Sequence, residues 1–107
     1  MKKKEIIKDS NEFSSIIKNS KYIKAKYFTI YYKDTNFDGP LFGITISKKA
    51  GHAVIRNKLK RRTKSIIDAN KLLFKNNEKY IIIIKATAVN INYNDLELDL
   101  ITAVKER

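Results

Sequence analysis

Residues 47–64 read Ser-Lys-Lys-Ala-Gly-His-Ala-Val-Ile-Arg-Asn-Lys-Leu-Lys-Arg-Arg-Thr-Lys, and this pattern predicts a strand end, a glycine turn and a helix. Gly51 permits a tight turn into the helix, because glycine adopts backbone conformations that other residues avoid. No Asp or Glu occurs between Gly39 and Ile67, whereas eight Lys and Arg residues do. The first amides of such a helix also favour anions. So concentrated a positive charge indicates a polyanionic partner.

Composition limits the class of protein. The chain has 107 residues, 43% of them hydrophobic, which suits a single domain with its own core. Its net charge of +12 favours nucleic acid or an anionic membrane as partner. The absence of cysteine excludes disulfides and thiolate metal sites and favours a reducing compartment. The longest apolar run, Tyr80–Ile84, is too short to span a bilayer, and no signal peptide follows Met1. We therefore expect a cytoplasmic protein.

Hydrophobic periodicity predicts three helices and three strands. A turn at Asp38–Pro40 separates the first two strands, which we expect to pair as an antiparallel hairpin. The run of four Ile residues predicts that the third strand is buried on both faces. The fold class expected is α+β, a small two-layer sandwich with helices packed on a mixed sheet. In chain order the elements are helix Asp9–Asn19, strands Lys26–Lys33 and Leu41–Lys48, helix Ala53–Asn70, strand Glu78–Ala86 and helix Asn94–Glu106.

Alternation divides the first two strands between two faces. The core face is predicted to carry Phe28, Ile30, Tyr32, Phe42, Ile44 and Ile46. The other face is predicted to carry Tyr27, Thr29, Tyr31, Gly43, Thr45 and Ser47. The last helix has an apolar stripe made of Leu96, Leu100, Ala103 and Val104.

The helix that follows Gly51 has separate apolar and basic faces. Arg56, Lys60 and Lys64 are spaced i, i+4, i+8 and form a ridge, which Asn57 and Arg61 widen. The apolar stripe consists of Ile55, Leu59 and Ile66, with Thr63 and Ile67 at its edge. A solvated face in a Lys-rich protein would also show this pattern. The acid-free window favours phosphate binding, because it spans strand, turn and helix together.

The pattern Ser-Lys-Lys-x-Gly-x-Ala-Val-x-Arg-Asn-Lys-x-Lys-Arg at Ser47–Arg61 resembles the signature of the protein subunit of bacterial ribonuclease P. Lys58 stands where the family usually has Arg, and His52 where it often has Asn. Arg62 stands where the family often has an apolar residue, so we expect it to pack at an edge. The likeness covers nearly the whole chain, in the family's order: the helix with Phe13, the strands Tyr27–Tyr31 and Phe42–Ser47, the strand Tyr80–Lys85, and Asn92–Leu96 before the last helix.

The resemblance implies a left-handed βαβ crossover and a single RNA-binding domain over residues 1–107. It also implies that the protein assists a catalytic RNA that cuts the 5′ leader from precursor tRNA. The RNA subunit would carry the chemistry, with Mg2+ bound mainly by RNA and substrate phosphates, and the protein alone would be inactive. The residues expected to meet the catalytic RNA are Lys48, Lys49, Gly51, His52, Arg56, Asn57, Lys58, Lys60, Arg61 and Lys64.

The family holds the single-stranded leader in a cleft between the first helix and the sheet. Aromatic and hydroxyl side chains on the non-core sheet face suit this role, because aromatic rings stack on unpaired bases. The residues expected to line the cleft are Phe13, Ile17, Tyr27, Tyr31, Thr45 and Ser47. Ile17 stands where the family commonly has a second Phe. Phe13 and Ile17 also fit a simpler role as core residues.

Other functions remain open at this point. A small ribosomal or other structural RNA-binding protein would explain the charge, but not the aromatic sheet face. A nuclease that acts alone is disfavoured, because His52 is the only histidine and the aspartates form no paired pattern. We expect no catalytic side chain, no metal site and no small-molecule substrate. Membrane attachment is disfavoured, because the apolar stripe of the basic helix is needed for the core.

Overall fold

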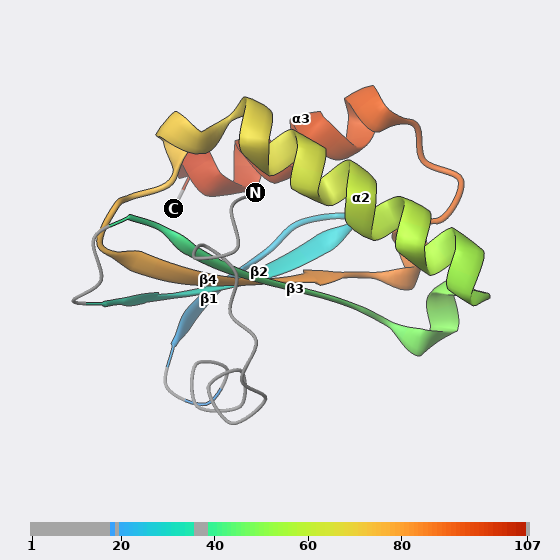
Figure 1. Ribbon diagram of the computed structural model, residues 1–107, viewed down its shortest axis with the longest axis horizontal. Coiled ribbons are helices and arrows are strands. Elements are labelled where there is room, and N and C mark those ends of the chain that lie inside the picture. The colour runs from blue at the N-terminus through green and yellow to red at the C-terminus, as the bar shows by residue number, and fades with distance from the viewer. Residues whose placement is uncertain (1–17, 19, 36–38, 107) are drawn as a thin grey trace.

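The computed structural model describes residues 18, 20–35 and 39–106, which form a four-stranded sheet with two α-helices on one face (Figure 1). In chain order the elements are β1 (Lys21–Lys24), β2 (Phe28–Asp34), β3 (Leu41–Ile46), the 3-10 helix η2 (Lys48–Ala50), α2 (Ala53–Ala69), η3 (Lys71–Leu73), β4 (Glu78–Ile84), η4 (Ala86–Ala88) and α3 (Tyr93–Glu106). The predicted α+β class is confirmed. The predicted helix at Asp9–Asn19, with Phe13 and Ile17, lies outside the described residues except for Lys18. None of the described helices is long and apolar enough to cross a membrane.

The strands lie in the order β1-β2-β4-β3 across the sheet. β2 runs antiparallel to both β1 and β4, whereas β3 runs parallel to β4. β4 therefore has a paired neighbour on each side. Ile81 and Ile82 point to opposite faces of β4, and both are fully buried. The prediction of a strand buried on both faces is confirmed.

The structure corrects two predictions about the sheet. The strands on either side of Asp38–Pro40 do not pair as a hairpin, because β4 lies between β2 and β3. A turn signal indicates that the chain reverses, but it does not determine which strands become neighbours. The hairpin instead joins β2 to β1, a strand that the sequence pattern does not predict. The β1 segment, Lys21–Lys24, is short and mostly exposed, so it lacks the apolar alternation that marks a strand.

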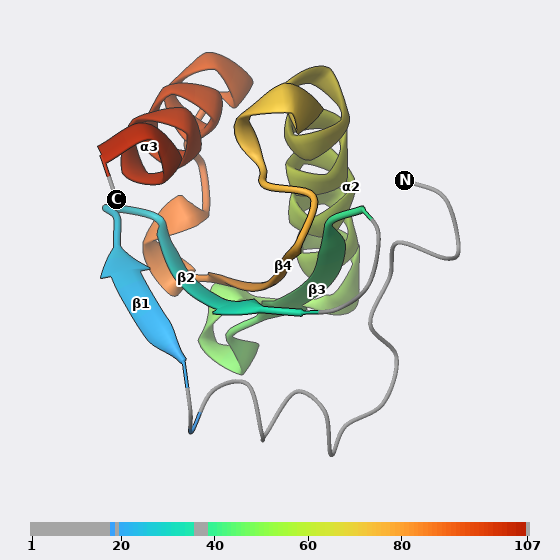
Figure 2. The same cartoon turned by 90° about the vertical axis from the view of Figure 1, so that its left-hand side faces the viewer.

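The connection from β3 through α2 to β4 joins two parallel neighbours. In Figure 2 both strands run away from the viewer with the helices above the sheet, and β4 lies to the left of β3. The crossover is therefore left-handed, as the resemblance implies. This hand is rare, because right-handed crossovers are the strong default for twisted sheets.

The main core lies between the sheet and the two helices. α2 buries Leu59, Thr63, Ile66 and Ile67, and α3 buries Leu96, Leu100, Ala103 and Val104. The Thr63 hydroxyl is satisfied inside this core by donating to the Leu59 carbonyl at 2.8 Å. Both predicted apolar stripes are confirmed with one correction. Ile55 is 38% exposed, because the first turns of α2 extend past the ends of the strands β3 and β4 (Figure 1).

A bend between β1 and β2 is fastened to the helix layer. The Asp99 carboxylate on α3 accepts the backbone N–H groups of Lys26 at 3.0 Å and Tyr27 at 2.9 Å. The Lys85 ammonium, just after β4, donates to the Ala25 carbonyl at 2.7 Å. The bend therefore has one charged partner on α3 and another just after β4, and both contacts hold the start of β2 in place.

Candidate nucleic-acid interface

The turn before α2 presents two lysines beside a glycine. Ser47 Oγ accepts the backbone N–H of Lys49 at 3.2 Å, which stabilises the short helix η2. Lys48 and Lys49 are exposed, whereas Ala50 is buried. Gly51 has a φ of +127°, and a Cβ there would lie 3.2 Å from the Cδ1 of Ile55. Both the backbone angle and the close approach favour glycine, as the sequence predicts.

The N-terminal end of α2 is electropositive. His52 is the N-cap residue, but its side chain makes no capping hydrogen bond and is exposed. The first turn of α2 contains no acidic residue, although the partial positive charge of a helix N-terminus normally favours one. Lys48 and Lys49 precede this end directly. The local field therefore favours an anion.

The cations from Lys48 to Lys64 have no carboxylate partner within the part of the chain that the structure describes. Arg56 is half-buried, and its Nε is enclosed without any hydrogen-bond partner among the described residues. Lys60 is also half-buried, while Asn57, Lys58, Arg61 and Lys64 are exposed. The positive charge of these Lys and Arg side chains is not neutralised within the described fold, which suits binding to a row of phosphates.

Arg62 lies at the edge of the core, as expected. Its guanidinium donates to the Ile91 carbonyl at 3.5 Å, in a cleft that Ile55, Leu59 and Val89 also line. The side chain thus spans from the apolar stripe of α2 to the loop before α3. We call the surface formed by Lys48, Lys49, Arg56, Asn57, Lys58, Lys60, Arg61 and Lys64 the basic surface. Arg62 is oriented away from it, toward Ile91.

The sheet face opposite the helices carries two cross-strand rows. In register across the four strands, the first row is Tyr22, Tyr31, Ile81 and Gly43, and the second is Lys24, Thr29, Ile83 and Thr45. Tyr31, Leu41 and Ile83 pack around the buried Ile81 and form a small apolar cluster separate from the main core. We call this surface, consisting of the two rows, the open sheet face; its members other than the buried Gly43 and Ile81 are partly or fully exposed. It offers aromatic rings and hydroxyl groups together.

The structure brings together some of the residues predicted for the cleft. Tyr31 and Thr45 lie on the open sheet face, and Ser47 follows β3 at the start of the basic turn. Tyr27 does not lie there, which corrects the prediction. Tyr27 packs against the main core and lines a pocket beside α3, because the bend held by Asp99 precedes β2 and interrupts the alternation.

Sequence reasoning missed Tyr22 and Lys24. Both lie on β1, and the rings of Tyr22 and Tyr31 are 5.5 Å apart between centroids with a 41° tilt. The Lys24 ammonium lies over the Tyr22 ring, 5.9 Å from its centroid. Tyr22 and Lys24 are two residues apart, which places them on one face of a strand. This spacing could be used only if β1 had been predicted as a strand.

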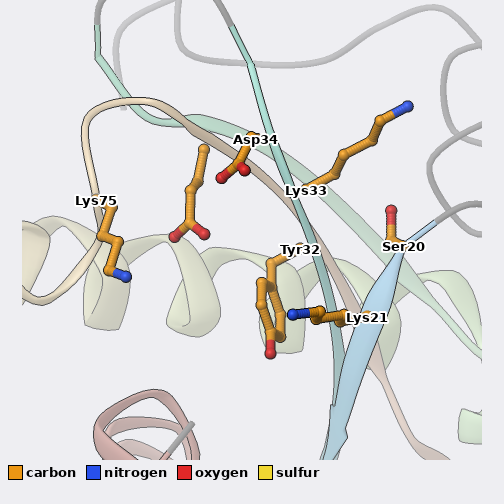
Figure 3. Close-up of a pocket in the computed structure, with 7 residues that line it drawn as sticks. Ser20, Lys21, Tyr32, Lys33, Asp34 and Lys75 are labelled. Atoms are coloured by element: carbon orange, nitrogen blue, oxygen red, sulfur yellow. The ribbon is translucent and has the colours of Figure 1, made fainter.

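A separate pocket opens where β1, β2 and the start of β4 meet (Figure 3). It encloses about 430 Å³ and is lined by Ser20, Lys21, Tyr32, Lys33, Asp34, Lys75 and Glu78. Glu78 is buried and accepts a hydrogen bond from the Tyr80 hydroxyl at 2.6 Å, and that hydroxyl accepts the Lys75 backbone N–H at 2.8 Å. These contacts tie the loop after α2 to β4. We interpret Glu78 as a structural residue.

The described residues form two surfaces with the chemistry for binding RNA. Among residues 18, 20–35 and 39–106, no three His, Cys, Asp or Glu side chains converge to hold a metal ion. The basic turn and α2 form one candidate RNA surface, and the open sheet face forms another. Together they can bind the backbone of a folded RNA and the bases of an unpaired strand.

Comparison with known proteins gives consistent results. The family model described as Ribonuclease P matches residues 1–107. The "Ribonuclease P protein component" of Mycoplasma mycoides is 37% identical over 107 residues, covering 99% of this chain and 98% of the relative. That of Mycoplasma capricolum is 38% identical with the same coverage. The solved RNase P protein of Staphylococcus aureus is 26% identical, with a TM-score of 0.88 over 95% of this chain and 94% of that one. The Thermotoga maritima RNase P protein, 23% identical, has the same fold with a TM-score of 0.87, covering 96% and 97% of the two chains.

Proposed function

We propose that the specific partners of this chain are the catalytic RNA of ribonuclease P and precursor tRNA. The chain belongs to the ribonuclease P protein family, whose members are subunits of an endoribonuclease holoenzyme. The holoenzyme would remove the 5′ leader and leave the mature 5′ end of the tRNA. The whole chain would act as a single RNA-binding domain, working in the cytoplasm.

The observation that carries this proposal is the unpaired positive charge of the turn and α2. Lys48, Lys49, Arg56, Lys60 and Arg61 have no carboxylate partners in the described fold. Each cation that contacts a phosphate releases a condensed counterion, so the binding free energy is favourable without any base being read. We assign this surface to the catalytic RNA.

The open sheet face is proposed to bind the leader. Tyr31 supplies an aromatic ring, and Thr45 supplies a hydroxyl group two strands away. Ring stacking tolerates any base, which suits a protein that must accept many different leaders. Phe13 and Ile17, in the helix that the sequence predicts at Asp9–Asn19, are proposed to complete the cleft.

We propose that the protein supplies positioning and charge neutralisation, while RNA supplies the chemistry. Mg2+ prefers hard oxygen ligands in near-octahedral geometry, and phosphate oxygens provide them. The described residues of this chain gather no comparable set of oxygen ligands. Mg2+ would therefore be bound mainly by RNA and substrate phosphates. Cations on the protein reduce the repulsion between two RNAs, so they would lower the Mg2+ concentration required.

Competition binding tests the leader assignment. The holoenzyme is assembled with wild-type protein or with Tyr31→Ala, and its affinities for precursor and mature tRNA are compared. Stacking on an unpaired base contributes roughly 1–3 kcal/mol, so Tyr31→Ala should weaken precursor binding by that amount and leave mature tRNA unaffected. Tyr31→Phe keeps the ring and should bind normally, as should Leu72→Ala, which removes a fully exposed side chain elsewhere. Equal losses for precursor and mature tRNA in folded protein would refute the assignment.

A further inference from the structure

Tyr22, on the edge strand β1, is the outermost residue of the first row on the open sheet face. It pairs directly with Tyr31 across the β1–β2 hairpin, and the two rings are 5.5 Å apart between centroids. We infer that Tyr22 provides a further stacking position for an unpaired leader nucleotide, beyond the one at Tyr31, with Lys24 beside it to contact a phosphate. This inference rests on the proposed binding of the leader to the open sheet face.

Exposure distinguishes Tyr22 from the aromatic residues of the core. Tyr22 is 55% exposed, whereas Phe28, Phe42 and Tyr80 are almost completely buried. The Tyr22 ring contacts Tyr31 on one side, and their tilt of 41° leaves no parallel gap into which a base could insert. A base would therefore stack on the exposed side of Tyr22, as an extension of the pair.

Lys24 gives this end of the sheet a charged group suited to RNA. Its ammonium lies 5.9 Å from the centre of the Tyr22 ring, within the range of a cation–π contact. Lys24 is exposed, so its flexible side chain can leave the ring and reach a phosphate of a stacked nucleotide. A ring and a cation together match the two parts of a nucleotide.

The position of β1 determines which leader nucleotide would be bound. β1 is one edge of the sheet, and β3, which leads into the basic turn, is the other. Three strand spacings separate these edges, which is about 14 Å at about 4.8 Å per spacing. A strand of RNA that enters beside the basic turn passes the partly exposed Thr45, Ile83 and Tyr31 before it reaches Tyr22. Tyr22 should therefore contact a nucleotide farther from the cleavage site than Tyr31 does.

A purely structural role for Tyr22 is the alternative. Aromatic cross-strand pairs stabilise hairpins modestly, and β1 is a short edge strand that would benefit. Such a role predicts a lower melting temperature in Tyr22→Ala and no dependence on the leader. The stacking role predicts that the effect appears only when the leader is long enough to reach β1.

A series of precursor tRNAs with leaders shortened one nucleotide at a time separates these roles. We expect Tyr22→Ala in the assembled holoenzyme to weaken binding of long-leader precursors by about 5- to 140-fold, the change that 1–3 kcal/mol per stacked base corresponds to. Below a threshold leader length, and for mature tRNA, the variant should match wild type. Tyr22→Phe keeps the ring and should behave as wild type throughout. Lys24→Ala should reduce the salt dependence of binding above the same threshold only.

Tyr31→Ala, measured in parallel, keeps the two proposals distinguishable. Tyr31→Ala should lose affinity at shorter leader lengths than Tyr22→Ala does. The inference is overturned if Tyr22→Ala binds as wild type at every leader length, or if it loses the same affinity at every length. The proposed function still stands in that case, provided that the affinity lost by Tyr31→Ala depends on the leader. If neither variant distinguishes precursor from mature tRNA, both proposals fail. If Tyr22→Ala does not fold, Tyr22→Leu replaces it, because it keeps an apolar side chain and removes the ring.

Discussion

The Asp99 carboxylate on α3 accepts the backbone N–H of Tyr27 at 2.9 Å, and this contact joins the last helix to the bend before β2. The second carboxylate oxygen accepts the N–H of Lys26 at 3.0 Å. One side chain thus satisfies two backbone donors more than 70 residues away in sequence. It also turns Tyr27 toward the helix layer and leaves Tyr31 as the first aromatic residue of β2 on the open sheet face.

Asp99→Ala should lower the free energy of unfolding by about 1–2 kcal/mol, because it leaves two backbone donors without their acceptor. Asp99→Asn keeps one acceptor oxygen and should lose less. Thermal or urea unfolding measures both variants. A wild-type unfolding curve for Asp99→Ala would show that water replaces the carboxylate at no cost.

The cations on α2 should set the salt dependence of binding to the catalytic RNA. Arg56→Ala, Lys60→Ala and Arg61→Ala combined should weaken binding and reduce the slope of log K against log salt concentration by somewhat less than one unit per lost phosphate contact. Lys105→Ala, an exposed cation on α3, is the matched control and should leave the slope unchanged. An unchanged slope in the triple variant would mean that these cations are only solvated.

Gly51→Ala tests the turn that joins the two lysines to α2. The variant must accept a φ of +127° and a contact of 3.2 Å with Ile55, so we expect a loss of stability of about 1–3 kcal/mol and weaker RNA binding. Gly39→Ala has a φ of +106° but nothing within 4 Å, so it isolates the cost of the backbone angle. A loss in Gly51→Ala no greater than in Gly39→Ala would remove the close approach to Ile55 as a cause.

Tyr80→Phe tests the buried hydrogen bonds at the start of β4. The ring stacks on Phe42 and meets Phe74 edge-on, and both aromatic contacts survive the substitution. Only the hydroxyl is lost, which leaves the buried Glu78 carboxylate without that donor. The free energy of unfolding should fall by about 1–3 kcal/mol in a denaturant titration. RNA affinity in folded protein should not change, since the Tyr80 ring lies in the main core, on the face of β4 opposite the open sheet face. A selective loss of affinity would contradict its structural assignment.

The sequence predicts the individual helices and strands better than it predicts which strands pair in the sheet. α2, α3 and β4 are marked by strong periodicity or a continuous apolar run, and the structure confirms them. The pairing of β4 between β2 and β3 depends on contacts distant in sequence, which a turn signal at Asp38–Pro40 does not encode. The left-handed crossover came from the family resemblance alone, because physical rules favour the other hand.

The candidate site was predicted unevenly for similar reasons. The basic surface is continuous in sequence, so its turn and helix could be assigned from charge and glycine placement. The open sheet face is assembled from four strands, and only its residues on two predicted strands were found. Tyr22 was not predicted because β1 was not predicted. Tyr27 was assigned to the wrong face because strand alternation gives no sign of the contact between its backbone N–H and Asp99.

Cleavage of precursor tRNA across a range of Mg2+ concentrations tests the central claim most directly. The measurement compares the protein alone, the catalytic RNA alone and the two combined. We predict no cleavage by RNA-free protein, cleavage by the RNA alone only at high Mg2+, and cleavage by the combination at low Mg2+. Robust Mg2+-dependent cleavage by the purified protein alone, or no change in the Mg2+ requirement when it is added, would contradict the account.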